Sequence, residues 1–249
     1  LLTARSHVKI PYLSLVGNSW ADYKDFVREV QIDGALRNSS LSTDDIACFS
    51  PGLRDWHTLF GGIDVDFNGT VADFETRVRS LRVGEDTFLA ATAKIEGLPD
   101  VRQTLFDLDV SRLVASADDL KRLSRDIARK ELPENLVAML GRAGTLGVRA
   151  RFRGRLSSFK LKAAVNSEVG DVDVDLAMQP LPKGRRSLRG ALAARGFRLG
   201  RLLGQSRLLG NATLTASIDG SVGRGTTDAK VEGNISQLEF KGYTYDSLR

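Results

Sequence analysis

The chain has 249 residues, 42% of them hydrophobic and 27% charged, a composition typical of a folded globular protein that excludes wholesale disorder. It contains no long apolar run, which excludes a bundle of membrane-spanning helices. The single cysteine, Cys48, excludes an internal disulfide framework and a cysteine-based zinc cluster, and two histidines, His7 and His57, disfavour a metal site or triad built on histidine. The net charge of +5 permits contact with anionic surfaces without requiring it.

The two ends do not resemble natural termini. The sequence begins at Leu1 without a methionine, a basic leader or an apolar signal core, and it stops at Arg249 inside an alternating pattern. We therefore expect the chain to be an internal piece of a longer protein, so that any membrane anchor would belong to the full-length parent.

Alternation of apolar and polar residues dominates the chain and predicts about thirteen strands separated by Gly-, Asn- and Pro-containing turns. The candidate strands cover residues 8–16, 25–37, 61–71, 74–82, 86–96, 101–112, 148–156, 159–163, 172–178, 186–198, 210–219, 227–237 and 239–248. The predicted fold class is all-β and mainly antiparallel, with the sheet curled into a gutter of stacked repeats and a few short helices.

Four short helical segments interrupt the strands. A capping-type serine followed by two carboxylates predicts helix starts at Ser42 and Ser116, and Pro51 would end the first of these helices. The helix near Ser116 is expected to be the longest. Another should follow Pro133 and end near a glycine at 141 or 144, and residues 199–204 predict a single turn.

The sequence also repeats itself. The phrase from Ile63 to Phe74 recurs 85 residues later from Val148 to Phe159, and a weaker copy begins at Leu214. Units of this kind bury their apolar faces by stacking, which predicts a quasi-linear β assembly. We expect residues 1–249 to form a single repetitive segment with approximate units 25–100, 101–180 and 186–249.

One apolar face stands out across three consecutive strands. Side chains at even spacing should share this face, which would line a groove. They are Val148, Ala150, Phe152, Leu156, Phe159, Leu161, Ala163, Val165, Val172, Val174, Leu176 and Met178. The opposite face would carry an arginine row, two lysines and the row from Asp171 to Asp175. We interpret these charges as a salt-bridged, solvated surface in preference to a nucleic-acid interface.

No motif for catalysis, for a metal or for a cofactor is evident. The Gly-rich stretch 220–225 fits neither a dinucleotide fingerprint nor a phosphate-binding loop, and acidic residues two apart on a strand indicate a solvated face. We interpret Cys48 as a buried structural thiol, His57 as a packing residue, and the carboxylate pairs at 44–45 and 118–119 as helix caps. We therefore expect a protein that is not an enzyme.

Several phrases resemble the TamB family (translocation and assembly module) of the AsmA-like superfamily. These phrases are Ser40–Ile46, Phe67–Phe74, Gly97–Asp100 and Phe240–Leu248. The resemblance implies a β-rich periplasmic rod whose parent is anchored in the inner membrane of a Gram-negative cell envelope. It also implies phospholipid transport between the two membranes, with acyl chains in an apolar trough, and a role in outer-membrane biogenesis.

The resemblance further implies a partner, an Omp85-type outer-membrane barrel (TamA-like), bound by regions outside this chain. Two alternatives remain open. The chain could be a chaperone-like scaffold that assembles barrel proteins and autotransporters by β-augmentation, which would link it to protein secretion. It could also be a purely structural β-solenoid whose apolar faces pack on one another.

Overall fold

The computed structural model describes residues 5–20, 22–46, 58–128, 131–223 and 227–248. Strands make up 61% of the described residues, and every pairing between consecutive strands within a compact unit is antiparallel. The predicted fold class, mainly antiparallel β with a few short helices in an unclosed sheet, is confirmed. The chain divides into two compact units, residues 1–132 and 133–249.

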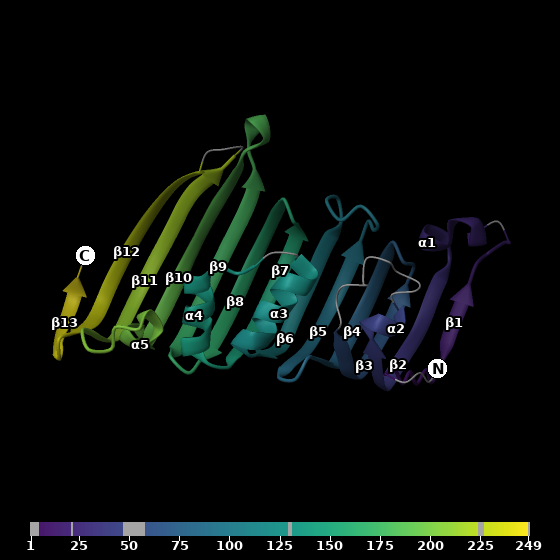
Figure 1. Ribbon diagram of the computed structural model, residues 1–249. Coiled ribbons are helices and arrows are strands. Elements are labelled where there is room, and N and C mark those ends of the chain that lie inside the picture. The colour runs from purple at the N-terminus through teal and green to yellow at the C-terminus, as the bar shows by residue number, and fades with distance from the viewer. Residues whose placement is uncertain (1–4, 21, 47–57, 129–130, 224–226, 249) are drawn as a thin grey trace. The chain divides into compact units, whose positions relative to one another are not determined.

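Unit 1 is a meander of six strands. Its elements are β1 (Leu13–Val16), η1 (Asp22–Asp25), α1 (Phe26–Glu29), β2 (Gln31–Ser42), α2 (Thr43–Ile46), β3 (Leu59–Gly69), β4 (Asp73–Val83), β5 (Thr87–Glu96), β6 (Leu105–Ala115) and α3 (Ala117–Ala128). The strands pair in sequence order, and among the described residues β1 and β6 do not pair with each other, so the sheet of this unit is open (Figure 1).

Unit 2 repeats this organisation with seven strands. It contains α4 (Glu134–Ala143), β7 (Leu146–Arg155), β8 (Ser158–Ser167), β9 (Gly170–Pro180), η3 (Pro182–Gly184), β10 (Arg186–Arg198), α5 (Leu199–Leu203), β11 (Leu209–Val222), β12 (Thr227–Phe240) and β13 (Tyr243–Leu248). The pairing again follows the sequence, and within its described residues β7 and β13 do not meet.

The predicted helices form where the capping residues indicated. The Ser116 hydroxyl accepts the Asp119 N–H at 3.2 Å and caps α3, which is the longest described helix. Helix α4 follows Pro133 and ends at Gly144, and α5 ends at Gly204 in the left-handed conformation. Helix α2 begins after Ser42, whereas the expected stop at Pro51 lies outside the described residues.

Three predicted strands are wrong at their starts. Strand β1 begins at Leu13 and not at residue 8, and β6 begins at Leu105, after a turn over residues 101–103. The third is the strand expected over residues 25–37. Residues 25–29 alternate in polarity, yet η1 and α1 occupy this stretch, and β2 begins only at Gln31. The Asp22 carboxylate explains the difference, because it accepts the N–H groups of Asn18 and Ser19 at 2.6 and 3.0 Å and so supports a helical turn. A short alternating pattern does not overcome this local hydrogen bonding.

The repeated phrase has a structural basis in two β-hairpins. Gly69 pairs with Phe74 across the β3–β4 hairpin, and Gly154 pairs with Phe159 across the β7–β8 hairpin. The two glycines have φ values of +131° and +128°, and a Cβ on either one would lie 2.3 or 2.2 Å from a backbone oxygen of the facing strand. Because only glycine tolerates this approach, the spacing of the phrase is set by hairpin geometry.

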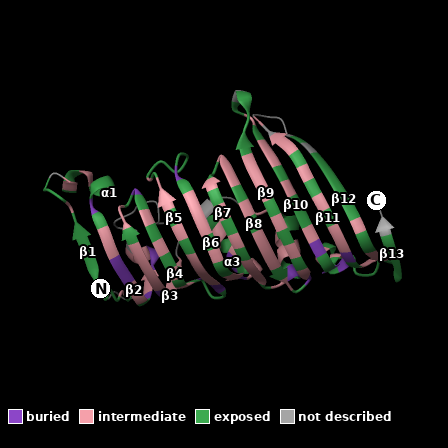
Figure 2. Ribbon diagram, turned by 180° about the vertical axis from the view of Figure 1, so that it is seen from behind, coloured by how far each residue is buried: buried purple, intermediate pink, exposed green. Residues whose placement is uncertain are grey.

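The buried core is small. In unit 2 the buried cluster forms where the end of α4 and the loop between β8 and β9 meet β10. It consists of Ala143, Val169, Ala194 and Phe197. The hydrogen bond from the Glu168 N–H to the Ala143 carbonyl, at 3.0 Å, fixes the end of α4 against this loop. Figure 2 shows the buried residues of unit 2 towards one end of its strands, while intermediate and exposed residues alternate along the remainder.

Candidate functional site: an open apolar face on unit 2

The apolar side chains of unit 2 are aligned in rows that run across the strands. Because β7 to β12 pair without a change of register at these positions, side chains opposite one another share a face. One row consists of Phe152, Leu161, Leu176, Gly190, Ile218 and Val231. The neighbouring row consists of Ala150, Ala163, Val174, Leu192, Ala216 and Gly233. The rows make one continuous apolar face over six strands.

Eleven of the twelve residues predicted to line a groove lie on this face. The register joins Val148 to Val165 and Val172, and it joins Gly154 to Phe159 and Met178. The placement of Leu156 was wrong, because β7 ends at Arg155 and Leu156 lies in the following turn with 53% of its surface exposed. The alternation of apolar and polar residues continues to Leu156 in the sequence, although the chain leaves the strand just after Gly154, which has a positive φ.

The lining predicted from the sequence stopped at β9, whereas the face continues onto β10, β11 and β12. Leu188, Leu192 and Ile218 extend it, and their alternation in residues 186–198 and 210–219 had indicated strands. This alternation, together with pairing of the strands in sequence order, is enough to predict that these residues share the same face. The face is therefore about twice as wide as the three strands predicted to form it.

This face is covered at one end and open over the rest. Figure 1 shows α4 and α5 on one side of the unit 2 sheet, and Val172 and Leu214 pack beside the buried cluster at their end. The predicted lining residues on β7 to β9 are only half-buried, and Leu192 remains 36% exposed. An ordinary core would bury such side chains, so the uncovered part is an unusually exposed apolar surface for a folded protein.

Aromatic rings lie at the uncovered end of the face. The rings of Phe152 and Phe159 stack with their centroids 5.0 Å apart. Phe159 also lies opposite Gly154, where no side chain of the facing strand competes for space. The two stacked rings present an apolar surface without any polar atom that would need a hydrogen-bonding partner.

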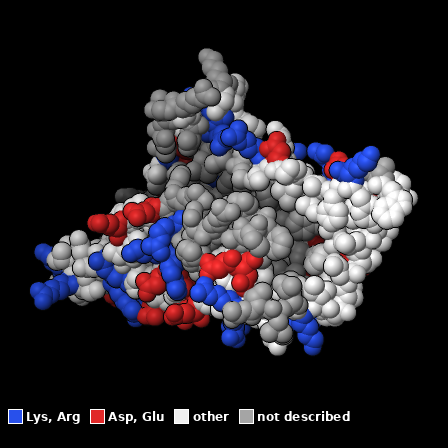
Figure 3. Space-filling view, turned by 45° about the vertical axis from the view of Figure 1, so that its right-hand side comes forward, with Lys and Arg blue, Asp and Glu red and all other residues white. Residues whose placement is uncertain are grey.

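The opposite face of the same strands is charged. Lys162 pairs with Asp175 at 3.3 Å, Arg195 with Asp173 at 3.6 Å, and Arg189 with Asp219 at 3.3 Å. These contacts confirm the predicted neighbourhood of the lysines and the aspartate row. Figure 3, turned by only 45° from the view of Figure 1, does not display this face; on the surface that it shows, basic and acidic side chains are also interspersed. Ion pairs of this exposure stabilise little, and they act here mainly by keeping this face in water.

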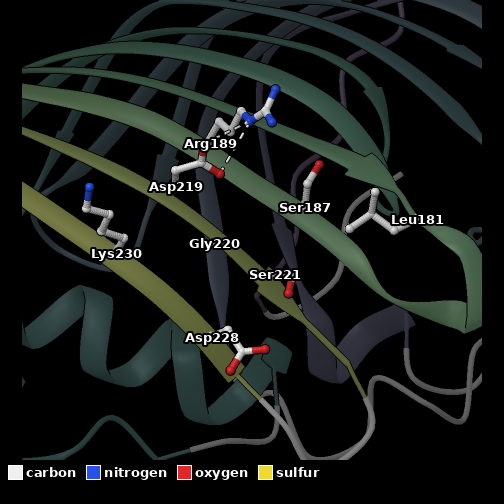
Figure 4. Close-up of a pocket in the computed structure, with 8 residues that line it drawn as sticks. All are labelled: Leu181, Ser187, Arg189, Asp219, Gly220, Ser221, Asp228 and Lys230. Carbon is white, nitrogen blue, oxygen red and sulfur yellow. Dashed lines mark hydrogen bonds and ion pairs between the residues drawn. The ribbon is translucent and has the colours of Figure 1, made fainter.

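A polar hollow of about 700 Å³ lies on the charged face, not on the apolar one (Figure 4). It is lined by Leu181, Ser187, Arg189, Asp219, Gly220, Ser221, Asp228 and Lys230. Arg185 enters beside it and donates to Asp228 at 2.9 Å. The cations and carboxylates of the hollow balance one another, so it has no net charge with which to select an ionic ligand.

Unit 1 contains a compact ion-pair quartet and a buried carboxylate. Arg37 and Arg79 each contact both Asp64 and Asp66, and the hydrogen bond from Arg37 is the largest cause that lowers the Asp66 pKa. Asp119 is 2% exposed and accepts hydrogen bonds from the Thr87 hydroxyl, the Asp86 N–H and Arg122. These groups are satisfied by structural partners.

Of the remaining candidate residues, the two histidines and Cys48, His7 alone lies in the described part of the chain. Within the described residues no group of three or more His, Cys, Asp or Glu side chains is placed to hold a metal ion. His7 is exposed and forms an isolated bridge with Ser40. The interpretations of Cys48 and His57 fall on residues outside the described part of the chain.

Comparisons with protein-family models, with curated proteins and with solved structures gave no match to this chain. Of the helices that the structure describes, none combines the length and apolarity needed to cross a bilayer.

Proposed function

We propose that the open apolar face of β7 to β12 binds phospholipid acyl chains, as a segment of a lipid-conducting groove. The observation that carries this proposal is an apolar face over six strands whose side chains stay half-buried or exposed in the folded unit. The resemblance to the TamB family supports placing such a segment in the periplasm, between an inner-membrane anchor and an Omp85-type barrel. No enzymatic step is part of the proposal.

The chemistry of the face suits an acyl chain. Hydrocarbon needs volume and the exclusion of water, not hydrogen-bond donors, and the rows supply only alanine, valine, leucine, isoleucine and phenylalanine side chains, with glycine at two positions. Each buried methylene contributes about 0.8 kcal/mol, so a chain of about 16 carbons gains on the order of 10 kcal/mol from full burial. A partly enclosing groove supplies a fraction of this, which lowers the cost of leaving a bilayer.

Two adjacent alanines on β8 allow a matched test. Ala163 lies on the apolar face between Ala150 and Val174, and Ala164 lies on the charged face between Arg149 and Asp173. In the Ala163→Asp variant a carboxylate must leave water whenever lipid occupies the groove, at a cost of several kcal/mol. Ala164→Asp introduces the same group on the solvated face and serves as the control.

The readouts are phospholipid bound to the purified protein, by mass spectrometry, and the thermal melting temperature. We expect Ala163→Asp to lose bound lipid while melting within a few degrees of the wild type, and Ala164→Asp to keep both. Leu161→Glu should behave as Ala163→Asp does. Unfolding of Ala163→Asp together with a lipid-free wild type would show a closed core and refute the groove.

A further inference from the structure

Trp20 is the most exposed large apolar side chain among the described residues, with 91% of its surface in water. Tyr23 and Phe26 follow it at intervals of three and are 42% and 39% exposed. The rings of Trp20 and Tyr23 lie with their centroids 5.8 Å apart, and Phe26 begins α1, which directly follows η1. We call Trp20, Tyr23 and Phe26 the aromatic patch.

The structure holds this patch outward. The Asp22 carboxylate accepts hydrogen bonds from the backbone of Asn18 and Ser19 and from the Ser19 hydroxyl, at 2.6 to 3.0 Å. The absence of a side chain at Gly17 admits the Tyr23 ring, whose nearest carbon would be 3.0 Å from a Cβ there. These contacts join residues 17–19 to Asp22 and Tyr23, and Trp20 stays exposed beside them.

We propose that the aromatic patch docks on the interfacial region of a phospholipid bilayer. Tryptophan and tyrosine combine an apolar body with a polar tip, the property that favours them where hydrocarbon meets head groups. The charges of residues 22–29 nearly cancel, because Lys24 and Arg28 offset two of the three carboxylates and Arg28 pairs with Asp25 at 3.1 Å. The patch is therefore suited to zwitterionic lipid, with little dependence on salt.

The area of the patch disfavours a protein partner. An aromatic side chain buries about 150–250 Å² when fully enclosed, and a stable protein interface needs about 800 Å² on each partner. Three rings that are already partly covered fall short of that area. A bilayer imposes no such threshold, because rings that enter the interface individually contribute to binding.

The test uses Trp20 as its own probe. The chain has two tryptophans, so Trp56→Phe leaves Trp20 as the sole indole emitter. With phosphatidylcholine vesicles whose acyl chains carry bromine, we expect the Trp20 emission to shift to the blue and to be quenched. In the otherwise wild-type chain, Trp20→Ala should weaken vesicle co-sedimentation by about tenfold or more, and Tyr243→Ala, which removes another exposed aromatic ring, should not.

Emission that keeps its water-exposed wavelength with vesicles would overturn the proposal, as would vesicle binding unaffected by Trp20→Ala. A blue shift that follows protein concentration without vesicles would assign the patch to a second copy of the chain and would also overturn it. The inference does not rest on the groove. Ala163→Asp combined with Trp56→Phe should lose groove lipid yet keep the Trp20 shift.

Discussion

The Asp119 carboxylate accepts a hydrogen bond of 2.9 Å from the Thr87 hydroxyl, joining the first turn of α3 to the start of β5. Both side chains are buried, Asp119 at 2% and Thr87 at 5% exposure. Burial works against the charged carboxylate, but the donors Thr87, Asp86 and Arg122 outweigh it and hold the Asp119 pKa below its usual value. The helix is thus attached to the sheet of unit 1 by a charged group.

We predict that Asp119→Asn lowers the free energy of unfolding at pH 7 by about 1–3 kcal/mol, because an amide cannot satisfy all the donors that face this carboxylate. Asp118→Asn is the matched control. Asp118 is exposed, so this substitution should change the free energy of unfolding by only about a few tenths of a kcal/mol. Urea unfolding measures both. Equal losses in the two variants would show that the helix dipole, not the Thr87 contact, is responsible.

The same carboxylate predicts a dependence on pH. Its folded-state pKa lies below the unfolded value near about 4, so its stabilisation is complete above that pH and is lost as the pH falls through the folded pKa. Urea midpoints from pH 6 to pH 3 should fall more steeply for the wild type than for Asp119→Asn. Parallel profiles would contradict this assignment.

The hairpin glycine gives a second stability prediction. Gly154→Ala should destabilise unit 2 by about 1–3 kcal/mol, because alanine at φ +128° would place Cβ 2.2 Å from the Ser158 carbonyl oxygen. Gly147→Ala on the same strand has its nearest contact at 3.9 Å and should be close to neutral. Thermal melting of the two variants tests this, and an unchanged Gly154→Ala would reject the hairpin interpretation of the repeat.

Two residues of β10 allow the covered and the uncovered parts of the apolar face to be compared. Phe197 is 8% exposed in the cluster with Ala143 and Val169, so Phe197→Ala should cost about 3–5 kcal/mol. Leu192 is 36% exposed, and Leu192→Ala should cost about 1 kcal/mol or less. Chemical denaturation gives both values. A large loss for Leu192→Ala in lipid-free protein would indicate that the face is closed.

The charged face should tolerate substitution. Lys162 and Asp175 are 76% and 57% exposed, so Asp175→Ala should change stability by less than about 0.5 kcal/mol and leave bound phospholipid unchanged. The measurement is the same pair of melting curves and mass spectra used for Ala163→Asp. Loss of bound phospholipid in Asp175→Ala would show that part of the lipid site lies on the charged face.

Much of this fold follows from period-two alternation and turn residues. In β7 to β9 nothing interrupts the pleat, so the sequence predicted which side chains share a face, and only Leu156 departed from it. In β2 to β5 the register shifts repeatedly, for example between Leu36 and Ser39 and between Gly61 and Asp64. A bulge exchanges the two faces and leaves no fixed mark in the sequence, so the faces of unit 1 could not be assigned in advance.

Tertiary partners were the other part that the sequence could not supply. The cap supplied by Ser116 was predictable, but the interpretation of Asp119 as a capping carboxylate was wrong. Its carboxylate accepts from Thr87 and Asp86, in a hairpin about thirty residues earlier in the chain, the Thr87 hydroxyl being 32 residues away. The outward position of Trp20 likewise depends on Gly17 and Asp22, whose contacts appear only when the loop is folded. Local sequence patterns therefore predicted the helices and strands, whereas the exposure of individual side chains depends on contacts between distant parts of the chain.

Pairing in strict sequence order has a consequence for how such a molecule can lengthen. In a meander every ladder joins two consecutive strands, so the closing of one hairpin does not wait for a distant part of the chain. Inserting or deleting a pair of strands preserves the alternation of faces and leaves every other ladder intact. The reach of the apolar face is therefore a quantity that duplication can adjust in steps of about 10 Å per hairpin, without redesign of any existing contact.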